Sequence, residues 1–337
     1  MFKKFLLLIF VCLIAFSAFV YYQLIEMDKW LSTPWNKGTE DVVVNIPAGS
    51  SVRGALAILI KEKLVKKTPF VRLVGKVGKK VDSVQKGEYV FSSSQSPIEM
   101  LQIMSQGKVK QYSFTIPEGF SVKDIALTLE QKGYAKSKDV LALAKDKEFL
   151  SSQGLNYLEG YLFPDTYKIP NGYSVRQILT MMIKNYRKNV TPEMIAKARE
   201  MGFKESDIPK IASVVEKESG SPKEYVIVSS VIHNRIKKGM MLQMDPTVIY
   251  GIKNFNGNLT RKDLRTDHPW NTYTRFGLPA TPISNPGLGA LKAAVNPAKT
   301  KYLYFVSMNN GSHKFTSTLK EHNKAVNKYQ VRGHVGP

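Results

Sequence analysis

The strongest feature of the hydrophobic pattern is a long, mostly apolar run without charged residues over residues 5–25. As a helix this run would be roughly 30 Å long, which is enough to cross the hydrocarbon core of a bilayer. Lys3 and Lys4 precede the run, and polar residues follow it. Because positive charge favours the cytoplasmic side, the N-terminus is expected in the cytoplasm and the rest of the chain outside.

A cleaved signal peptide is the competing interpretation of this run. Signal peptides have an apolar core of about 7 to 15 residues and a cleavage site of small residues. The run is longer than that, and Phe19, Val20 and Tyr21 are bulky. An uncleaved anchor is therefore favoured. Cys12, the one cysteine of the chain, lies within the run, so the external part is expected to fold without an internal disulfide.

Beyond the anchor, a strand–turn–helix pattern occurs twice, and Ile46 and Ile116 mark equivalent positions 70 residues apart. Each copy has an apolar strand, an Ile-Pro-x-Gly turn and an amphipathic helix. Ser51 and Ser121 stand where a hydroxyl can cap the helix N-terminus. Between the copies, a further strand is followed by a helix that begins near Ser96. The pattern predicts one or two small α+β modules.

Two further helices are predicted after residue 205. The first contains IASVVEKES, and the second starts near Ser221, where Glu224 is expected to complete a capping box. The chain then loses its periodicity over residues 240–287. Such long loops in a compact domain are usually functional. The predicted fold class is α+β, with a single N-terminal membrane helix.

Glu218 stands at a position that a simple surface helix does not explain. At about 100° per residue, Ile211, Val214 and Val215 define an apolar arc that contains Glu218, whereas Glu216 falls at its edge. A carboxyl group on an apolar face loses hydration of its charged form, so its pKa rises, as a general acid requires. The alternative is that Glu218 ends the helix and reaches solvent or an arginine.

Most glycosidases need a second carboxylate. The candidates are Glu216, Glu159, Asp165 and Asp245. No spacing places any of them beside Glu218. A mechanism with one carboxylate, in which the substrate supplies its own nucleophile, is therefore also considered.

The formal net charge of +22 favours contact with polyanions such as nucleic acid, anionic lipid or acidic wall polymers. A generally basic proteome would also explain this charge. Nucleic acid is not expected as a partner, because no nucleic-acid motif or glycine-rich phosphate loop occurs in the sequence. The histidines lack a zinc-binding spacing, so neither a metal nor a cofactor is expected.

Several stretches of the sequence match one known family in the same order. They are EGYLFPDTY (159–167), IASVVEKES (211–219), NRIKKGMMLQMDPTVIYG (234–251), WNTYTRFGLPATPISNPGLGALKAAVNPAKTKYLYFV (270–306) and HKFTSTLKEHNKAV (313–326). Through them the chain resembles the YceG-like family, the endolytic murein transglycosylases. One departure is Trp270, where tyrosine is common in the family.

The resemblance implies a domain layout. Residues 1–27 form the cytoplasmic tip and anchor, 28–41 a linker, 42–135 a LysM-like α+β region that contains the repeat, and 136–337 a mixed α+β catalytic domain. The match is strong over the catalytic domain and only pattern-level over the LysM-like region. Whether that region binds glycan stays open.

The resemblance also implies cleavage of the β-1,4 bond after N-acetylmuramic acid in peptidoglycan, with a 1,6-anhydro ring at the new end. The family's catalytic glutamate matches Glu218. Glu218 would protonate the glycosidic oxygen and then deprotonate the muramyl C6 hydroxyl that attacks C1. This role agrees with the helix geometry and needs no second carboxylate.

Other residues fall in matching loops. Those expected to line the glycan groove are Gln243, Asp245, Asn271, Thr272 and Tyr273. Tyr161 and Phe163 either stack on sugars or pack. Glu216 is assigned to structure, with a basic neighbour as its partner. Three residues match a family motif without an assigned role: His313, Glu321 and Asn323.

The anchor would hold the active site near newly made strands at the outer face of the inner, cytoplasmic membrane. Cleavage there would terminate strands or set their length. The wall synthases (penicillin-binding proteins) are then expected partners. Two alternatives remain open. One is a non-catalytic envelope scaffold that binds peptidoglycan, and the other is a muramidase, which uses water and needs a base opposite Glu218.

Overall fold

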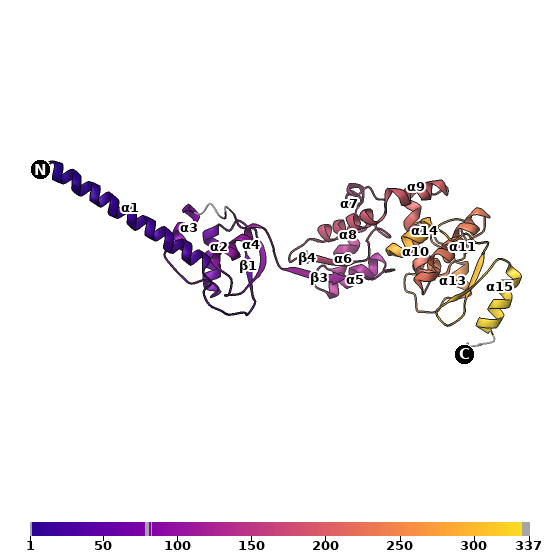
Figure 1. Cartoon of the computed structure of the whole chain (residues 1–337). Helices are drawn as coiled ribbons and strands as arrows, with labels where there is room; N and C mark the ends of the chain where they lie inside the picture. The colour runs from indigo at the N-terminus through magenta and orange to yellow at the C-terminus, as the bar shows by residue number, and fades with distance from the viewer. Residues whose placement is uncertain (1, 78–80, 82, 332–337) are drawn as a thin grey trace. The chain divides into compact units, whose positions relative to one another are not determined.

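The computed structural model describes residues 2–77, 81 and 83–331, which form one long N-terminal helix, shorter helices and two-stranded sheets (Figure 1). This α+β architecture confirms the predicted fold class. By their contacts the residues form two units. Unit 1 is Met1–Ser113 with Lys168–Gly172, and unit 2 is Phe114–Tyr167 with Tyr173–Pro337.

Helix α1 (Phe2–Ser32) is the long N-terminal helix, and it is long and apolar enough to cross a membrane. None of its most apolar window is buried in the structure. Near its end, Met27 and Leu31 are buried in the core of unit 1. They lie four residues apart and therefore on one helix face. The helix thus continues into the segment that was expected to be a linker.

Unit 1 is built on an antiparallel strand pair. Strand β1 (Val42–Ile46) pairs with β2 (Gly87–Phe91), and Val44 lies opposite Tyr89. The helices of the unit are α2 (Val52–Lys61), α3 (Val71–Val77) and α4 (Pro97–Ser105). Buried residues of α2, α4 and both strands share one hydrophobic core with the end of α1.

Both copies of the repeat fold as a strand, a turn and a capped helix. The predicted caps are confirmed: the Ser51 hydroxyl accepts from the Gly54 amide at 3.1 Å, and the Ser121 hydroxyl accepts from the Asp124 amide at 3.2 Å. Ser96 caps α4 in the same way. Strand β3 (Gln111–Thr115) of the second copy pairs with β4 (Thr166–Pro170).

The second helix of the repeat, α5 (Val122–Gln131), belongs to unit 2. The chain passes between the units within β3, whereas the sequence placed the boundary after residue 135. The next helices of unit 2 are α6 (Ser137–Leu143), α7 (Lys147–Ser152), α8 (Val175–Asn189) and α9 (Pro192–Glu200).

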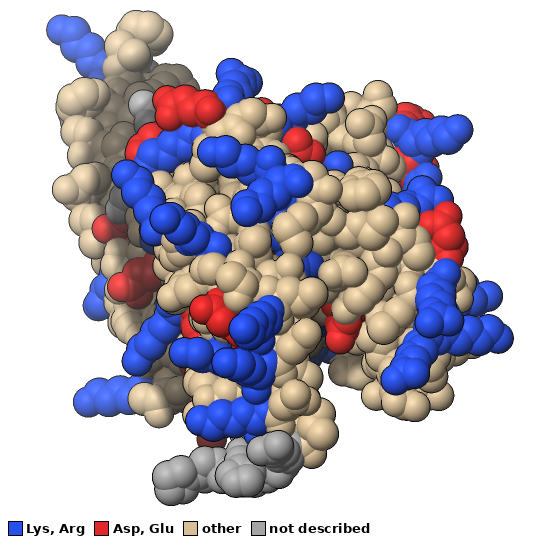
Figure 2. All heavy atoms as spheres, turned by 90° about the vertical axis from the view of Figure 1, so that its right-hand side faces the viewer, with Lys and Arg blue, Asp and Glu red and all other residues tan. Residues whose placement is uncertain are grey.

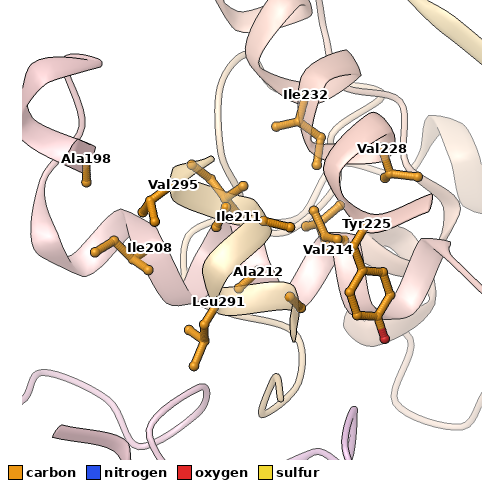
Figure 3. Packing of buried hydrophobic residues seen from close by; sticks show 14 of the residues in the cluster. Ala198, Ile208, Ile211, Ala212, Val214, Tyr225, Val228, Ile232, Leu291 and Val295 are labelled. Atoms are coloured by element: carbon orange, nitrogen blue, oxygen red, sulfur yellow. The ribbon is translucent and has the colours of Figure 1, made fainter. Parts of the chain in front are cut away.

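Three helices form the centre of the core of unit 2. Helix α10 (Ile208–Glu218) packs against α11 (Tyr225–Lys237) and α14 (Leu288–Val295). Ile211, Val214 and Leu291 are almost fully buried in this core, whose packing is shown in Figure 3. The apolar arc predicted for the first of these helices is therefore its buried face.

The remaining elements of unit 2 lie before, within and after the long loop. They are η1 (Glu205–Asp207), η2 (Pro222–Glu224), α12 (Asp245–Gly251), α13 (Arg261–Arg265), β5 (Tyr304–Ser307), β6 (His313–Thr316), α15 (Leu319–Val326) and η3 (Asn327–Val331). Strands β5 and β6 pair as an antiparallel hairpin.

Truncation of Leu291 is expected to destabilise unit 2. This side chain is fully buried, so Leu291→Ala should lower the free energy of unfolding by about 2–5 kcal/mol. Leu127 on α5 is 42% exposed, and Leu127→Ala should change it by no more than about 0.5 kcal/mol. Thermal unfolding of the full chain in detergent micelles measures both. Equal effects of the two substitutions would contradict this description of the core.

Candidate active site

A cavity of about 530 Å³ in unit 2 contains the carboxyl group of Glu218 in its wall. Glu218 is the last residue of α10, so the packing of that helix fixes the backbone position from which the side chain extends. The polar residues that matter most in the wall are Glu218, Arg235, Gln243, Asp245, Tyr273 and His313. The cavity therefore brings together residues from α10, α11, the long loop and β6.

Four of the residues predicted for the site line this cavity: Glu218, Gln243, Asp245 and Tyr273. Gln243 has a φ of 50°, which non-glycine residues seldom adopt. Its backbone is held there because the Gln243 amide donates to the Thr272 carbonyl at 3.0 Å. Asp245, two residues later, begins α12 and projects into the same cavity wall.

Asn271 and Thr272 are buried and do not line the cavity. The Asn271 side-chain amide donates to the carbonyl of Thr266 at 2.7 Å and of Leu264 at 3.1 Å. The Thr272 hydroxyl accepts from the Met244 amide at 3.0 Å. In this structure both residues hold the long loop in shape and act on the cavity through Gln243 and Asp245.

The pKa of Glu218 is raised to about 8, chiefly by burial and also by the nearby charge of Asp245, whereas the charge of Arg235 lowers it. The residue is partly exposed and lines the cavity. Desolvation disfavours a carboxylate, so Glu218 keeps its proton at neutral pH. It has the protonation state that a general acid needs.

Arg235 is a cavity residue that the sequence analysis missed. Its Nε donates to the Leu303 carbonyl at 2.6 Å, and its Nη1 donates to the Leu242 carbonyl at 2.8 Å. Burial lowers the pKa of Arg235 from its usual value. Arg235 lies four residues after Val231, which is buried in α11. That spacing on an apolar helix face is the signal that could have identified it.

Tyr273 orients Asp245. The Tyr273 hydroxyl donates to Asp245 Oδ1 at 2.5 Å, and Asp245 therefore faces the cavity with one oxygen already occupied. Burial, followed by this bond, raises the pKa of Tyr273, so the hydroxyl keeps its proton.

The other candidates for a second carboxylate do not line the cavity. Glu159 is buried and accepts from the Val122 amide at 3.0 Å, the Tyr250 hydroxyl at 2.9 Å and the Asn285 side-chain amide at 2.8 Å. Burial raises the pKa of Glu159 to about 7. Asp165 accepts from the Asn185 side-chain amide at 2.8 Å. Among the candidates, Asp245 is the one in the wall of the cavity.

Glu216 has a structural role, but its partners are not basic. Its carboxylate accepts from the Tyr225 hydroxyl and, at 2.9 Å, from the amide of Gly287. Gly287 is the N-cap of α14, where orphan amides favour a negative charge. The prediction of a basic partner is therefore wrong, and Glu216 ties α10 to the start of α14.

Tyr161 and Phe163 lie away from the cavity wall. Phe163 is buried in the core of unit 2, and Tyr161 packs against that core. The Tyr161 ring meets the Tyr186 ring edge-on at a centroid distance of 4.9 Å. In this structure both aromatic residues pack.

Glu224 does not complete the capping box predicted with Ser221, whose side chain makes no capping hydrogen bond. Glu224 instead binds His313, another residue of the cavity wall.

Glu321 completes the capping box of α15, because it accepts from the Thr318 amide at 3.1 Å and hydroxyl at 2.9 Å. Asn323 is exposed on the same helix.

Within residues 2–77, 81 and 83–331, no group of three or more His, Cys, Asp or Glu side chains is placed to hold a metal ion. The model of the YceG-like family matches residues 44–328. This chain belongs to the YceG-like family. The matched range includes all six polar residues of the cavity wall named above.

Other proteins of the family are similar over most of this YceG-like chain. It is 33% identical to the endolytic murein transglycosylase of Bacillus subtilis over 94% of its own length and 91% of that protein. The endolytic murein transglycosylase of Streptococcus pneumoniae is 26% identical over 95% of this chain and 63% of that protein. A crystal structure of a yceG-like protein from Listeria monocytogenes matches with a TM-score of 0.58 and 32% identity, over 85% of this chain and 99% of that one.

The environment of Glu218 has a consequence for stability. In the unfolded chain Glu218 ionises near its ordinary pKa of 4.5, whereas in the folded chain it stays protonated up to about pH 8. Unfolding therefore releases a proton between these values, and this group lowers stability as the pH rises through them. Glu218→Gln removes the effect and should stabilise the fold by up to about 5 kcal/mol at pH 8.5.

The measurement is thermal unfolding of the full chain in detergent micelles at pH 5 and at pH 8.5. The gain in Tm from Glu218→Gln should be small at the lower pH and larger at the higher one. Lys217→Gln is the control, because Lys217 is exposed on the same turn. A gain that does not depend on pH would show that Glu218 is not desolvated in the folded chain.

Proposed function

We propose that this protein is a membrane-anchored endolytic murein transglycosylase, and that Glu218 is its general acid. The observation that carries the proposal is a protonated, desolvated glutamate in the wall of an open cavity. The relatives in Bacillus subtilis and Streptococcus pneumoniae bear the name of this activity. The substrate is the glycan strand of peptidoglycan, cut at the β-1,4 bond between N-acetylmuramic acid and N-acetylglucosamine.

In this mechanism Glu218 first gives its proton to the glycosidic oxygen. The bond between that oxygen and the muramyl C1 breaks, and the N-acetylglucosamine leaves with a hydroxyl at C4. The muramyl C6 hydroxyl then bonds to C1, and its proton passes to Glu218. The glutamate ends the cycle protonated, and the new strand end carries a 1,6-anhydro ring.

The surroundings of Glu218 suit both proton transfers. A desolvated carboxylate is a stronger base than one in water, which favours removal of the C6 proton. The positive charge of Arg235 favours the ionised form of Glu218, so the carboxylate formed between the two steps is tolerable. The guanidinium cannot swing away, because backbone carbonyls hold its Nε and Nη1.

A muramidase is the second candidate, and Asp245 is the observation that favours it. Asp245 lines the same cavity and raises the pKa of Glu218. In a muramidase Asp245 would activate water on the face of the sugar opposite Glu218, and the new end would be a reducing sugar. The two candidates therefore differ in the chemical nature of the end they produce.

The loop residues predicted from the sequence also have roles in the proposal. Gln243, Asp245 and Tyr273 contact the glycan, whereas Asn271 and Thr272 position the loop that carries them.

The apolar helix α1 anchors the protein in the cytoplasmic membrane with its N-terminus inside. Wall synthases at the outer face of that membrane would be its partners. Figure 2 shows Lys and Arg side chains spread over one face, which suits anionic wall and membrane surfaces.

The first test is mass spectrometry of the products when the full chain, in detergent micelles, acts on purified glycan strands. Internal cuts that end in anhydro-muramic acid are expected. Glu218→Gln should reduce the rate by about 10²-fold to 10⁴-fold, and Lys217→Gln should leave it unchanged. Reducing ends would favour the muramidase. Glycan binding by the wild type without any cleavage would favour the non-catalytic scaffold.

The pH dependence of cleavage gives a second test. Activity should fall as the pH rises through about 8, because Glu218 then loses the proton it must donate. Asp245→Asn removes a charge that raises the pKa of Glu218, so the alkaline limb should move to lower pH. Initial rates between pH 5 and 10 measure the limb. A limb that stays in place in Asp245→Asn would contradict the coupling between these two residues.

A further inference from the structure

An ordered acid–base pair made by His313 and Glu224 lies beside the cavity, and its histidine is part of the cavity wall. His313 begins β6 and lines the cavity that contains Glu218. Its Nδ1 lies 2.7 Å from Glu224 Oε2, and its backbone amide donates to Glu224 Oε1 at 2.9 Å. The two side chains are only 13% and 14% exposed. One carboxylate thus fixes both the ring and the backbone of His313.

The ring is fixed from a second side. The Phe305 ring meets the His313 ring edge-on, with centroids 5.3 Å apart and an interplanar angle of 86°. Because Nδ1 is taken by Glu224, Nε2 is the ring nitrogen left for a ligand. Within the part of the chain that the structure describes, no residue forms a hydrogen bond with Nε2.

The pair is tied to the segment that follows the catalytic helix. Glu218 ends α10 and Glu224 ends η2, so both carboxylates belong to one short connection. The Ser219 hydroxyl donates to the Ser221 carbonyl at 2.8 Å and accepts from the Ser221 amide at 3.3 Å, which folds this connection. The position of His313 is therefore set relative to the same backbone that carries Glu218.

We infer that His313 Nε2 contacts the bound glycan, and that Glu224 is a positioning residue that fixes the imidazole. The inference rests on the proposed function and adds a substrate contact to it. Nε2 accepts from a hydroxyl or an amide N–H when the ring is neutral, and it donates to a carbonyl when the ring is protonated. An N-acetylated sugar offers all of these groups, so the ligand class is an N-acetylated sugar of the strand.

The alternative is that the pair only holds the β5–β6 hairpin, and two substitutions of His313 separate these roles. His313→Asn keeps a polar group near the position of Nδ1, so it retains the bond to Glu224 and loses the distal nitrogen. His313→Gln keeps a polar group near the position of Nε2 and loses the bond to Glu224. If Nε2 contacts the glycan, His313→Asn should be more stable than His313→Gln and should bind the glycan more weakly.

Binding is measured with the full chain in detergent micelles and purified, uncrosslinked glycan strands, in the Glu218→Gln background so that strands are not cut. His313→Asn should raise the Kd about fivefold to tenfold, as expected for one lost hydrogen bond. His313→Gln should raise it less than about threefold. Thermal unfolding of the same proteins gives the order of stability.

Glu224→Ala tests the positioning role. It should weaken binding when His313 is present and have no further effect together with His313→Asn, because the residue acts through the ring. Glu224→Gln keeps an acceptor for Nδ1 and should restore most of the affinity. Additive effects of Glu224→Ala and His313→Asn would overturn the positioning role.

Two outcomes would overturn the inference as a whole. One is an unchanged Kd in His313→Asn. The other is a Kd that rises, across all variants, in the same order as thermal stability falls. Either result would leave Glu218 as the acid, provided that Glu218→Gln lowers the rate of cleavage as expected. If Glu218→Gln cleaved strands at the wild-type rate, the proposed function would fail instead, and the KM of His313→Asn in the wild-type background would still decide the substrate contact.

Discussion

The desolvation of one carboxyl group is the constraint on which the rest of this site depends. Glu218 has its raised pKa chiefly because it is buried at the end of α10, a helix that packs against α11 and α14 and ends at the cavity. Desolvation of this carboxyl group lowers the stability of the folded chain. It is tolerable because the core around Val214 and Leu291 is tightly packed.

The wall opposite α10 is a long loop, and it is ordered by buried polar contacts instead of helical periodicity. Asn271 holds one part of the loop by binding backbone carbonyls, and Thr272 holds the segment that contains Gln243 and Asp245. Arg235 does the same from α11. Buried polar groups need partners, so each of these contacts also restricts the loop to one shape. The buried polar contacts that order this segment therefore also hold Gln243 and Asp245 at the cavity.

The carboxylates of unit 2 show how environment separates residues of one type. Glu159 and Glu216 are satisfied by amides and hydroxyls and serve as internal ties between segments. Glu224 is paired with His313. Glu218 accepts no such hydrogen bond from the residues that the structure describes, and burial leaves it protonated. The proposed acid therefore differs from these structural glutamates in the donors that reach its carboxyl group.

The sequence by itself determined the elements and the exceptional residue. Periodicity predicted the anchor helix, the capped helices after Ser51 and Ser121, and the apolar arc that contains Glu218, because these depend on neighbours within a few residues. Only the tertiary structure decided which loop residues reach the cavity. Local pattern could mark Arg235 as buried, but it does not say which segments meet. The contact of Arg235 with Leu303 and the pairing of Glu224 with His313 join segments far apart in the chain, and the burial of Asn271 and Thr272 also depends on the folded chain.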